Sequence, residues 1–194
     1  MGEVEKYLVG KGSRLFLVAL AFFILGGPVY QQEVPTDFEM VKRILVVASA
    51  AWTDTELEVM KGQELYFTAG GTVSLQKDNP VASCGPEGLS LKTMQQPLPE
   101  QSLGALIGKI REKVEVTEDK QTGEKTQREF GTVFFIGKEN RVSLPSTGRL
   151  LLGINENVSG DNDGGFDVKI YMQKSSPEWK TFLRTGNAKS WVSF

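Results

Sequence analysis

Residues Gly148–Met172 read GRLLLGINENVSGDNDGGFDVKIYM and contain two strand patterns joined by a polar loop. The first, Gly148–Ile154, is an almost continuous apolar run, which is typical of a buried strand. In the second, Gly165–Met172, apolar residues alternate with Asp167 and Lys169, as in a strand with one face on the core and the other in water. This stretch therefore predicts an all-β fold.

Similar strand patterns continue outward along the chain. Runs with strand character lie between turns rich in Gly, Pro and Asn, at Ile44–Ala48, Thr55–Val59, Glu64–Ala69, Gly104–Ile110, Gly131–Ile136 and Asn140–Leu144. Period-two alternation in the second of these runs puts Leu57 and Val59 on one face. We expect a turn at Lys61–Gln63, and we expect Gly70 and Gly71 to end the strand before them. Several short strands with almost no helical periodicity predict a β-sandwich or barrel.

A long irregular stretch, Gln76–Gln101, separates the early strands from the late ones. It is punctuated by Pro, Gly and Asn residues that favour turns. A loop of this length without regular structure of its own is more often functional or specifically packed than incidental.

Composition narrows the chemistry that the chain can perform. The 194 residues are 40% hydrophobic, enough for a packed core in one domain, and they include no His and a single Cys, Cys84. This excludes His-dependent catalysis, His-containing metal sites, thiolate metal clusters and intrachain disulfides. The net charge of −2 gives no basic excess, so nucleic acid is not expected as a partner. The groups that remain for binding or catalysis are carboxylates, amides, hydroxyls and carbonyls, which act through their oxygen atoms.

The N-terminus has the pattern of an export signal. Basic residues precede the apolar run Leu15–Leu25, which is shorter than the roughly 20 residues of a comfortable membrane span. We expect residues 1–30 to form a signal peptide or a retained signal-anchor helix. The rest of the chain is then extracytoplasmic (periplasmic, secreted or anchored), and any membrane contact is made through this segment.

Three further regions follow from the composition along the chain. Residues 31–43 are predicted to be a linker, 44–174 a β-sandwich and 175–194 a C-terminal tail. The tail contains Trp179, Phe182, Leu183, Trp191 and Phe194, and it either docks on the sandwich or presents an apolar face to a partner. The segment 111–129 is dense in charges of both signs, which indicates a solvated hairpin or loop, or else a hairpin that binds a partner.

The loop Asn155–Gly165 is the strongest candidate for a site. It holds three carboxylates, three Asn amides and three glycines, and a hard cation such as Ca²⁺ takes about six to eight oxygen ligands. The spacing is not that of an EF-hand, because Phe166 stands at the twelfth position, where a bidentate Glu is needed. A turn-rich connection that uses Asn, Asp and Gly for their backbone freedom explains the composition equally well.

Clustered carboxylates also raise the hypothesis of a glycosidase. Glu156 would then work with Asp161 or Asp163 as an acid/base pair. That chemistry needs two carboxyl groups about 5–10 Å apart across a cleft, and a sandwich of this size leaves little cleft.

Five segments carry a resemblance to a known family. In chain order they are Gly85–Gly88, Leu103–Ile110, Phe134–Gly137, Ser146–Asn155 and Asp161–Val168. Together they resemble the calcium-dependent galactophilic bacterial lectin family over about Ala48–Met172. The resemblance implies a jelly-roll-like β-sandwich, similar to a galactose-binding domain, which binds sugar through a bound calcium ion.

The resemblance also implies a set of site residues. The calcium ligands fall on the backbone carbonyl of Leu75, the side chain of Glu156, a backbone carbonyl at Val158 or Ser159, and the side chains of Asp161 and Asn162. The sugar would contact the three side chains of that set, and Gln95 or Gln96 would supply one further hydrogen bond. The chain departs from the family in having no His for the sugar pocket, so galactose is not implied as the ligand.

The function expected from these features is calcium-dependent carbohydrate binding by an exported domain without catalytic activity. Sugar hydroxyls would complete the coordination of the ion, and association into a homo-oligomer is left open. The alternative is a structural or interaction module of the cell envelope, in which any bound calcium only stiffens the loop.

Overall fold

The computed structural model describes residues 33–118, 125–177 and 180. The chain divides into two units, Met1–Pro35 and Thr36–Phe194, and every described strand belongs to the second. The predicted signal segment 1–30 lies outside the described residues, as do the aromatic residues of the tail. In the described part of the chain, no helix is long and apolar enough to cross a membrane.

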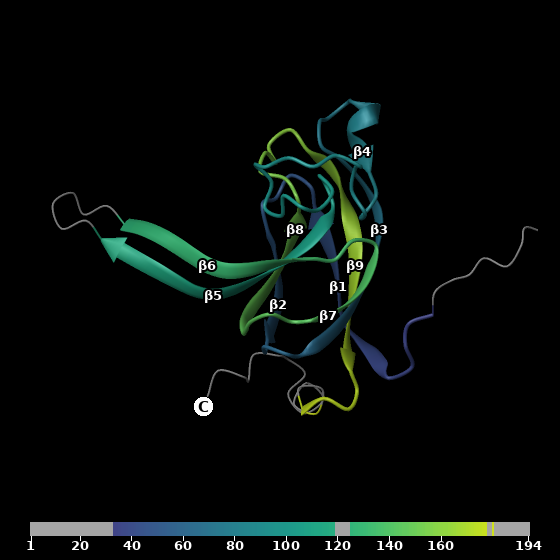
Figure 1. The fold of residues 1–194 in the computed structure, drawn as a ribbon, viewed down its shortest axis with the longest axis vertical. Helices are drawn as coiled ribbons and strands as arrows, with labels where there is room; N and C mark the ends of the chain where they lie inside the picture. Colours follow the sequence, from purple (N-terminus) through teal and green to yellow (C-terminus); the bar gives the residue numbers. More distant parts are fainter. Residues whose placement is uncertain (1–32, 119–124, 178–179, 181–194) are drawn as a thin grey trace, which may run out of the picture. The chain divides into compact units, whose positions relative to one another are not determined.

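The second unit is built from two antiparallel sheets (Figure 1). The strands are β1 (Phe38–Val47), β2 (Thr53–Val59), β3 (Glu64–Ser74), β4 (Ser83–Cys84), β5 (Leu106–Glu118), β6 (Lys125–Phe135), β7 (Glu139–Ser143), β8 (Gly148–Ile154) and β9 (Asp163–Gln173). One sheet has the order β1-β9-β3-β4, with β7 also paired to β3, and the other has the order β2-β8-β5-β6. This confirms the predicted all-β sandwich.

Both sheets contribute to one hydrophobic core. The buried residues include Val46, Phe67, Phe166, Val168 and Ile170 from the first sheet and Leu106, Ile110, Leu150 and Leu152 from the second. In β9 the buried residues alternate with half-buried ones, as the period-two pattern predicts. Leu57 and Val59 are both buried as well, so β2 presents the predicted face to the core.

The predicted end of β3 at Gly70 and Gly71 is wrong. The strand continues to Ser74 and pairs with β9 from Leu65 to Ser74. Gly71 has φ +107°, and a Cβ atom placed on it would lie 2.5 Å from the carbonyl oxygen of Gly165. Glycine is therefore required here by the close approach of β9, and not by a turn.

We expect Gly71→Ala to lower the free energy of unfolding by about 2 kcal/mol, because the new Cβ meets backbone that cannot move aside. Gly70→Ala is the matched control, because a Cβ at Gly70 meets nothing within 4 Å. Urea unfolding of both variants measures the difference. Equal stabilities would contradict the explanation by close approach.

The predicted boundary between the linker and the first strand changes in the structure. β1 begins at Phe38, so the second half of the predicted linker 31–43 is strand. Phe38 itself is buried, and its ring lies 6.0 Å from that of Tyr66. An apolar run does not mark this part of the strand, because it is interrupted by Glu39, Lys42 and Arg43.

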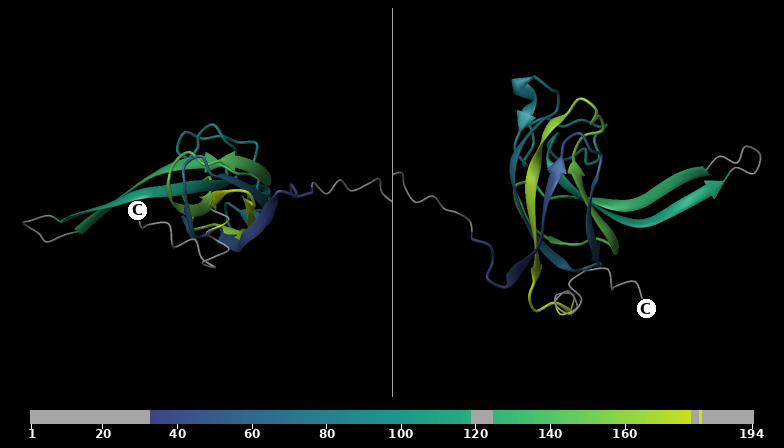
Figure 2. Two further views of the ribbon diagram at one scale, coloured as in Figure 1. Left: turned by 90° about the horizontal axis from the view of Figure 1, so that it is seen from below. Right: turned by 180° about the vertical axis from the view of Figure 1, so that it is seen from behind.

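The charged segment 111–129 is a hairpin in its described parts. β5 and β6 pair in register from Ile107 opposite Phe135 to Glu118 opposite Lys125. Both strands are therefore much longer than predicted, and they run on together away from the other strands of the unit (Figure 2).

Candidate functional site

The candidate site lies at one end of the sandwich, where the loop after β8 meets the loops on either side of β4 (Figure 1). The backbone N–H of Lys77 donates to the carbonyl oxygen of Asp161 at 2.7 Å. This bond holds the chain beyond Leu75 against the loop that contains Glu156. The structure therefore brings together the early and late segments of the predicted calcium site.

Asn155 anchors this end of the molecule from within. It is fully buried, and its side-chain Oδ1 accepts a hydrogen bond from the backbone N–H of Leu98 at 2.8 Å. Its Nδ2 donates to the carbonyl oxygens of Leu98 and Ser102, both at 3.0 Å. Asn155 thus fixes the long loop to the end of β8, and its side-chain polar atoms are occupied by the backbone of that loop.

Glu156 and Asn162 form the centre of the candidate site. The Nδ2 of Asn162 donates to Glu156 Oε2 at 2.9 Å and to the carbonyl oxygen of Ala48 at 3.4 Å. Asn162 is only 7% exposed, and its Oδ1 is buried without a hydrogen-bond partner. A buried amide oxygen that accepts nothing is costly, and it calls for a ligand or a bound ion or water.

The charged form of the Glu156 carboxyl is disfavoured at this position. Burial raises the pKa of this carboxyl, the hydrogen bond from Asn162 opposes the shift, and the charge of Asp161 adds to it. Burial, together with the charges of Glu156 and Glu87, also raises the pKa of the Cys84 thiol to about 11. Cys84 is buried and not in a disulfide, so it is a neutral packed thiol.

A cation at this site would have to rely on backbone oxygen. In the described ranges, no three Cys, Asp or Glu side chains are grouped as a metal-binding cluster. The loop offers the carboxylates of Glu156 and Asp161 and the free amide oxygen of Asn162. Ser159 already accepts a hydrogen bond from the N–H of Asn162 at 3.3 Å, and Val158 is 63% exposed. The donor set of oxygen atoms fits Ca²⁺ only if carbonyls or ligand hydroxyls complete it.

The two glutamines predicted to contact sugar have different surroundings. Gln95 is exposed. Gln96 is 4% exposed, its Nε2 donates to the carbonyl oxygens of Leu98 and Gln101, and its Oε1 accepts from Thr93. Gln96 therefore holds the long loop in shape, and its polar atoms are occupied.

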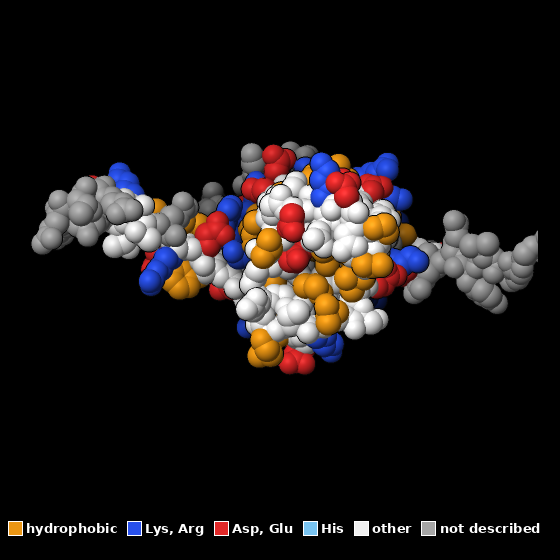
Figure 3. Space-filling view, turned by 90° about the horizontal axis from the view of Figure 1, so that it is seen from above, with side chains coloured by type: hydrophobic (Ala, Val, Ile, Leu, Met, Phe, Trp, Pro, Cys, Tyr) orange, Lys and Arg blue, Asp and Glu red, His pale blue; other side chains and the backbone are white. Residues whose placement is uncertain are grey.

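The surface around the candidate site is mixed in character. Seen from this end, acidic side chains lie among uncharged and hydrophobic ones (Figure 3). The exposed hydrophobic residues of the surrounding loops are Val81, Leu91, Met94 and Val158.

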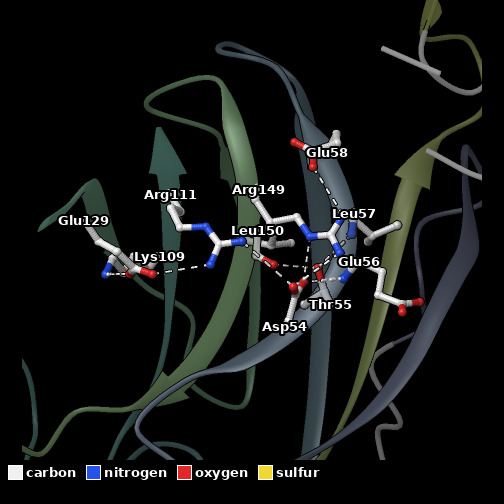
Figure 4. A network of polar contacts seen from close by, with 10 residues as sticks. All are labelled: Asp54, Thr55, Glu56, Leu57, Glu58, Lys109, Arg111, Glu129, Arg149 and Leu150. Carbon is white, nitrogen blue, oxygen red and sulfur yellow. Dashed lines mark hydrogen bonds and ion pairs between the residues drawn. The ribbon is translucent and has the colours of Figure 1, made fainter. Parts of the chain in front are cut away.

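A second polar network lies on the outer face of the β2-β8-β5-β6 sheet (Figure 4). Arg149 donates to Asp54 at 2.7 Å and to Glu58 at 3.2 Å. On the neighbouring strands, Arg111 and Lys109 both donate to Glu129. No local sequence pattern marks this network, because each cation meets its carboxylate partner only across neighbouring strands.

The ion pairs of this network stabilise the β2-β8-β5-β6 sheet. Burial raises the pKa of Asp54, but the hydrogen bonds from Arg149 and from the N–H of Glu56, with the charges of Arg149 and Arg111, bring it below its ordinary value. Each cation faces a carboxylate, so the charges stabilise one another across β2, β8, β5 and β6. The candidate site remains the loop end.

No family model matches the chain, and a search of curated proteins finds no similar sequence. Among solved structures, the N-terminal domain of EclA, described as a PllA-like lectin, is similar to this chain. It is 18% identical, with a TM-score of 0.47, and the match covers 71% of this chain and 99% of that domain.

Proposed function

We propose that the protein binds carbohydrate through a calcium ion held at the loop end of the sandwich. The observation that carries the proposal is the amide oxygen of Asn162, which is buried beside Glu156 and accepts no hydrogen bond. A cation placed there would satisfy this oxygen. It would also offset the repulsion between Glu156 and Asp161. Burial is the main cause of the raised pKa of Glu156, and this repulsion raises it further.

The remaining ligands would come from the backbone and from the sugar. The proposed carbonyls are those of Leu75 and of Val158 or Ser159. The bond between Lys77 and Asp161 supports the contribution of the Leu75 segment, because it holds that segment against the loop. Two vicinal hydroxyls of a sugar would complete the shell in place of water, since Ca²⁺ accepts neutral oxygen ligands and irregular geometry.

The residues around the ion would set the position of the sugar. Gln95 is exposed, and it is the glutamine that we propose as a hydrogen-bonding partner. Gln96 is left out because its amide is used by the loop backbone. In this proposal the protein is a binding protein without catalysis, so the carboxylates act as ligands and not as acid and base.

A calcium titration of the full chain, followed by thermal unfolding, tests the metal. We expect the midpoint of unfolding to rise with calcium, and we expect magnesium to give a smaller rise because it demands a more regular octahedral shell. No rise with calcium would contradict the proposal.

A glycan array, probed with calcium and again with a chelator, tests the ligand. We expect binding that the chelator abolishes. A calcium-induced rise in the unfolding midpoint without any glycan binding would contradict the carbohydrate assignment. It would favour the alternative of an envelope interaction module with structural calcium.

A further inference from the structure

The β5–β6 hairpin bends at a β-bulge where it leaves the rest of its sheet. The register shifts between Arg111 and Lys113, so Glu112 is one extra residue on β5. A bulge of this kind bends its strand and increases the local twist. The pairing of β8 with β5 also ends at Arg111. Beyond the bulge, residues 113–118 of β5 and 125–130 of β6 form the part of the hairpin that we call the arm (Figure 2).

The backbones of three strands approach closely at this bend. A Cβ atom placed on Gly131 of β6 would lie 2.3 Å from the carbonyl oxygen of Ile110. A Cβ atom placed on Gly148 of β8 would lie 2.3 Å from the carbonyl oxygen of Arg111. Glycine permits both approaches because it has no Cβ atom. The bend is therefore a closely packed junction of β5, β6 and β8.

Ion pairs cross the bend on the outer face of the sheet (Figure 4). Glu129 lies beyond the bulge, opposite Val114. Its carboxylate pairs with Lys109 at 2.9 Å and with Arg111 at 3.3 Å, and both cations lie before the bulge. The Lys109 side chain is 14% exposed, and its Nζ lies 5.4 Å from the centroid of the Trp52 ring. Because partly buried ion pairs are screened less by salt than exposed ones, Glu129 connects the arm firmly to the sandwich.

A hydrogen bond joins the two strands of the hairpin on its other face. Thr132 Oγ1 of β6 donates to Glu112 Oε1 at 2.7 Å. Side chains alternate along a strand, and an odd number of positions separates Thr132 from Glu129, so these two side chains lie on opposite faces of β6. The bend is thus held from both faces, by Glu129 on one and by Glu112 on the other.

The rest of the arm is held mainly by contacts within itself. In the described ranges, the ion pairs of residues 113–118 and 125–128 join arm residues to each other, Lys113 to Glu115 and Lys125 to Glu118. A two-stranded hairpin is only marginally stable in water. Without contacts across the bend, such an arm would be expected to change its angle to the sandwich readily.

We propose that the bend is rigid, and that Glu129 and Glu112 hold the arm at one angle to the sandwich. The arm then extends the β2-β8-β5-β6 sheet as a rigid body, and its exposed side chains keep fixed positions relative to the sandwich. The fixed angle also keeps open a hollow of about 520 Å³, which lies between residues 111–114 and the ends of β2 and β8. This proposal does not depend on the ligand of the loop end.

Pulsed electron paramagnetic resonance of the full chain tests the bend, with one spin label on the arm and one on the sandwich. The labels are attached to Val116→Cys and Ser143→Cys, at exposed positions of β5 and β7, while Cys84 is buried. We expect one narrow distance distribution. We expect Glu129→Ala to widen it, and the further change Glu112→Ala to widen it more. A wide distribution before either substitution, or an unchanged one after both, would overturn the proposal.

Two controls separate the bend from general effects of substitution. Glu115→Ala removes a carboxylate that pairs with Lys113 inside the arm, and it should leave the distribution as narrow as before. A second label pair, Glu100→Cys with Ser143→Cys, lies at exposed positions of the sandwich, and its distribution should stay narrow in Glu129→Ala. Equal widening in Glu115→Ala, or widening within the sandwich, would show a general loosening and would refute Glu129 as the residue that holds the bend.

Discussion

Asn155→Ala is expected to lower the free energy of unfolding by about 3–4 kcal/mol, because it removes a buried amide that no other group can replace. The side chain bonds the N–H and carbonyl of Leu98 and the carbonyl of Ser102. The substitution leaves these three backbone groups without their partner in the protein interior, and it opens a cavity. Urea unfolding followed by tryptophan fluorescence measures the loss.

Asn157→Ala is the matched control for this prediction. Asn157 stands two positions further along the same loop, but it is exposed, so its replacement should change stability by less than about 0.5 kcal/mol. If both alanine variants were equally stable, Asn155 would not be the anchor of the long loop. A loss of calcium response in Asn155→Ala at unchanged stability would instead make it a ligand.

The role of Asn155 depends on a long-range contact, which the sequence around it does not predict. The concentration of Asn, Asp and Gly after β8 singles out this loop in the sequence. From composition alone, each Asn side chain in this loop is an equally good candidate for a ligand. The structure separates them, because Asn155 bonds to Leu98, 57 residues away, while Asn162 bonds to Glu156 in its own loop. The roles depend on contacts that no local pattern contains.

The same distinction applies to the fold. Alternation in β9 and in the second half of β2 is a local signal with a local cause, and both strands appear where the pattern predicts. Gly71 is misread because its reason lies in β9, which approaches it from across the sheet. The outer part of the β5–β6 hairpin is predicted as a charged hairpin or loop, but the length of its strands is not, because these exposed residues carry charges in place of apolar runs. Sequence patterns find strands that face the core, and they miss strands that face water.

Without calcium, the stability of the protein is expected to fall as the pH rises from the ordinary glutamate range toward neutrality, through the contribution of Glu156. Its pKa in the folded state is raised, first by burial and then by Asp161. In this window the folded state binds more protons than the unfolded state, so the free energy of unfolding decreases with pH. Glu156→Gln removes this contribution, and it should be the more stable protein at neutral pH.

Carboxylates with lowered pKa values, such as Glu129 and Asp167, give the opposite slope at lower pH. The quantity to compare is therefore the difference between wild type and Glu156→Gln at each pH. Glu100→Gln, an exposed position in the long loop, controls for the change in net charge and should follow the wild type. A difference that does not change with pH would contradict the assignment to Glu156.

With calcium, we expect the wild type to become more stable than Glu156→Gln, which reverses their order without calcium. At a calcium concentration about 100 times the dissociation constant, binding stabilises the wild type by about 2.7 kcal/mol. Glu156→Gln keeps an oxygen that can accept from Asn162, but it loses the charge that a cation requires, so calcium should add little to its stability. The charged form of Glu156 then has two effects on the free energy of unfolding. Without calcium it lowers that free energy near neutral pH, and with calcium it provides the charge that binds the ion. Equal calcium stabilisation in both proteins would place the ion elsewhere.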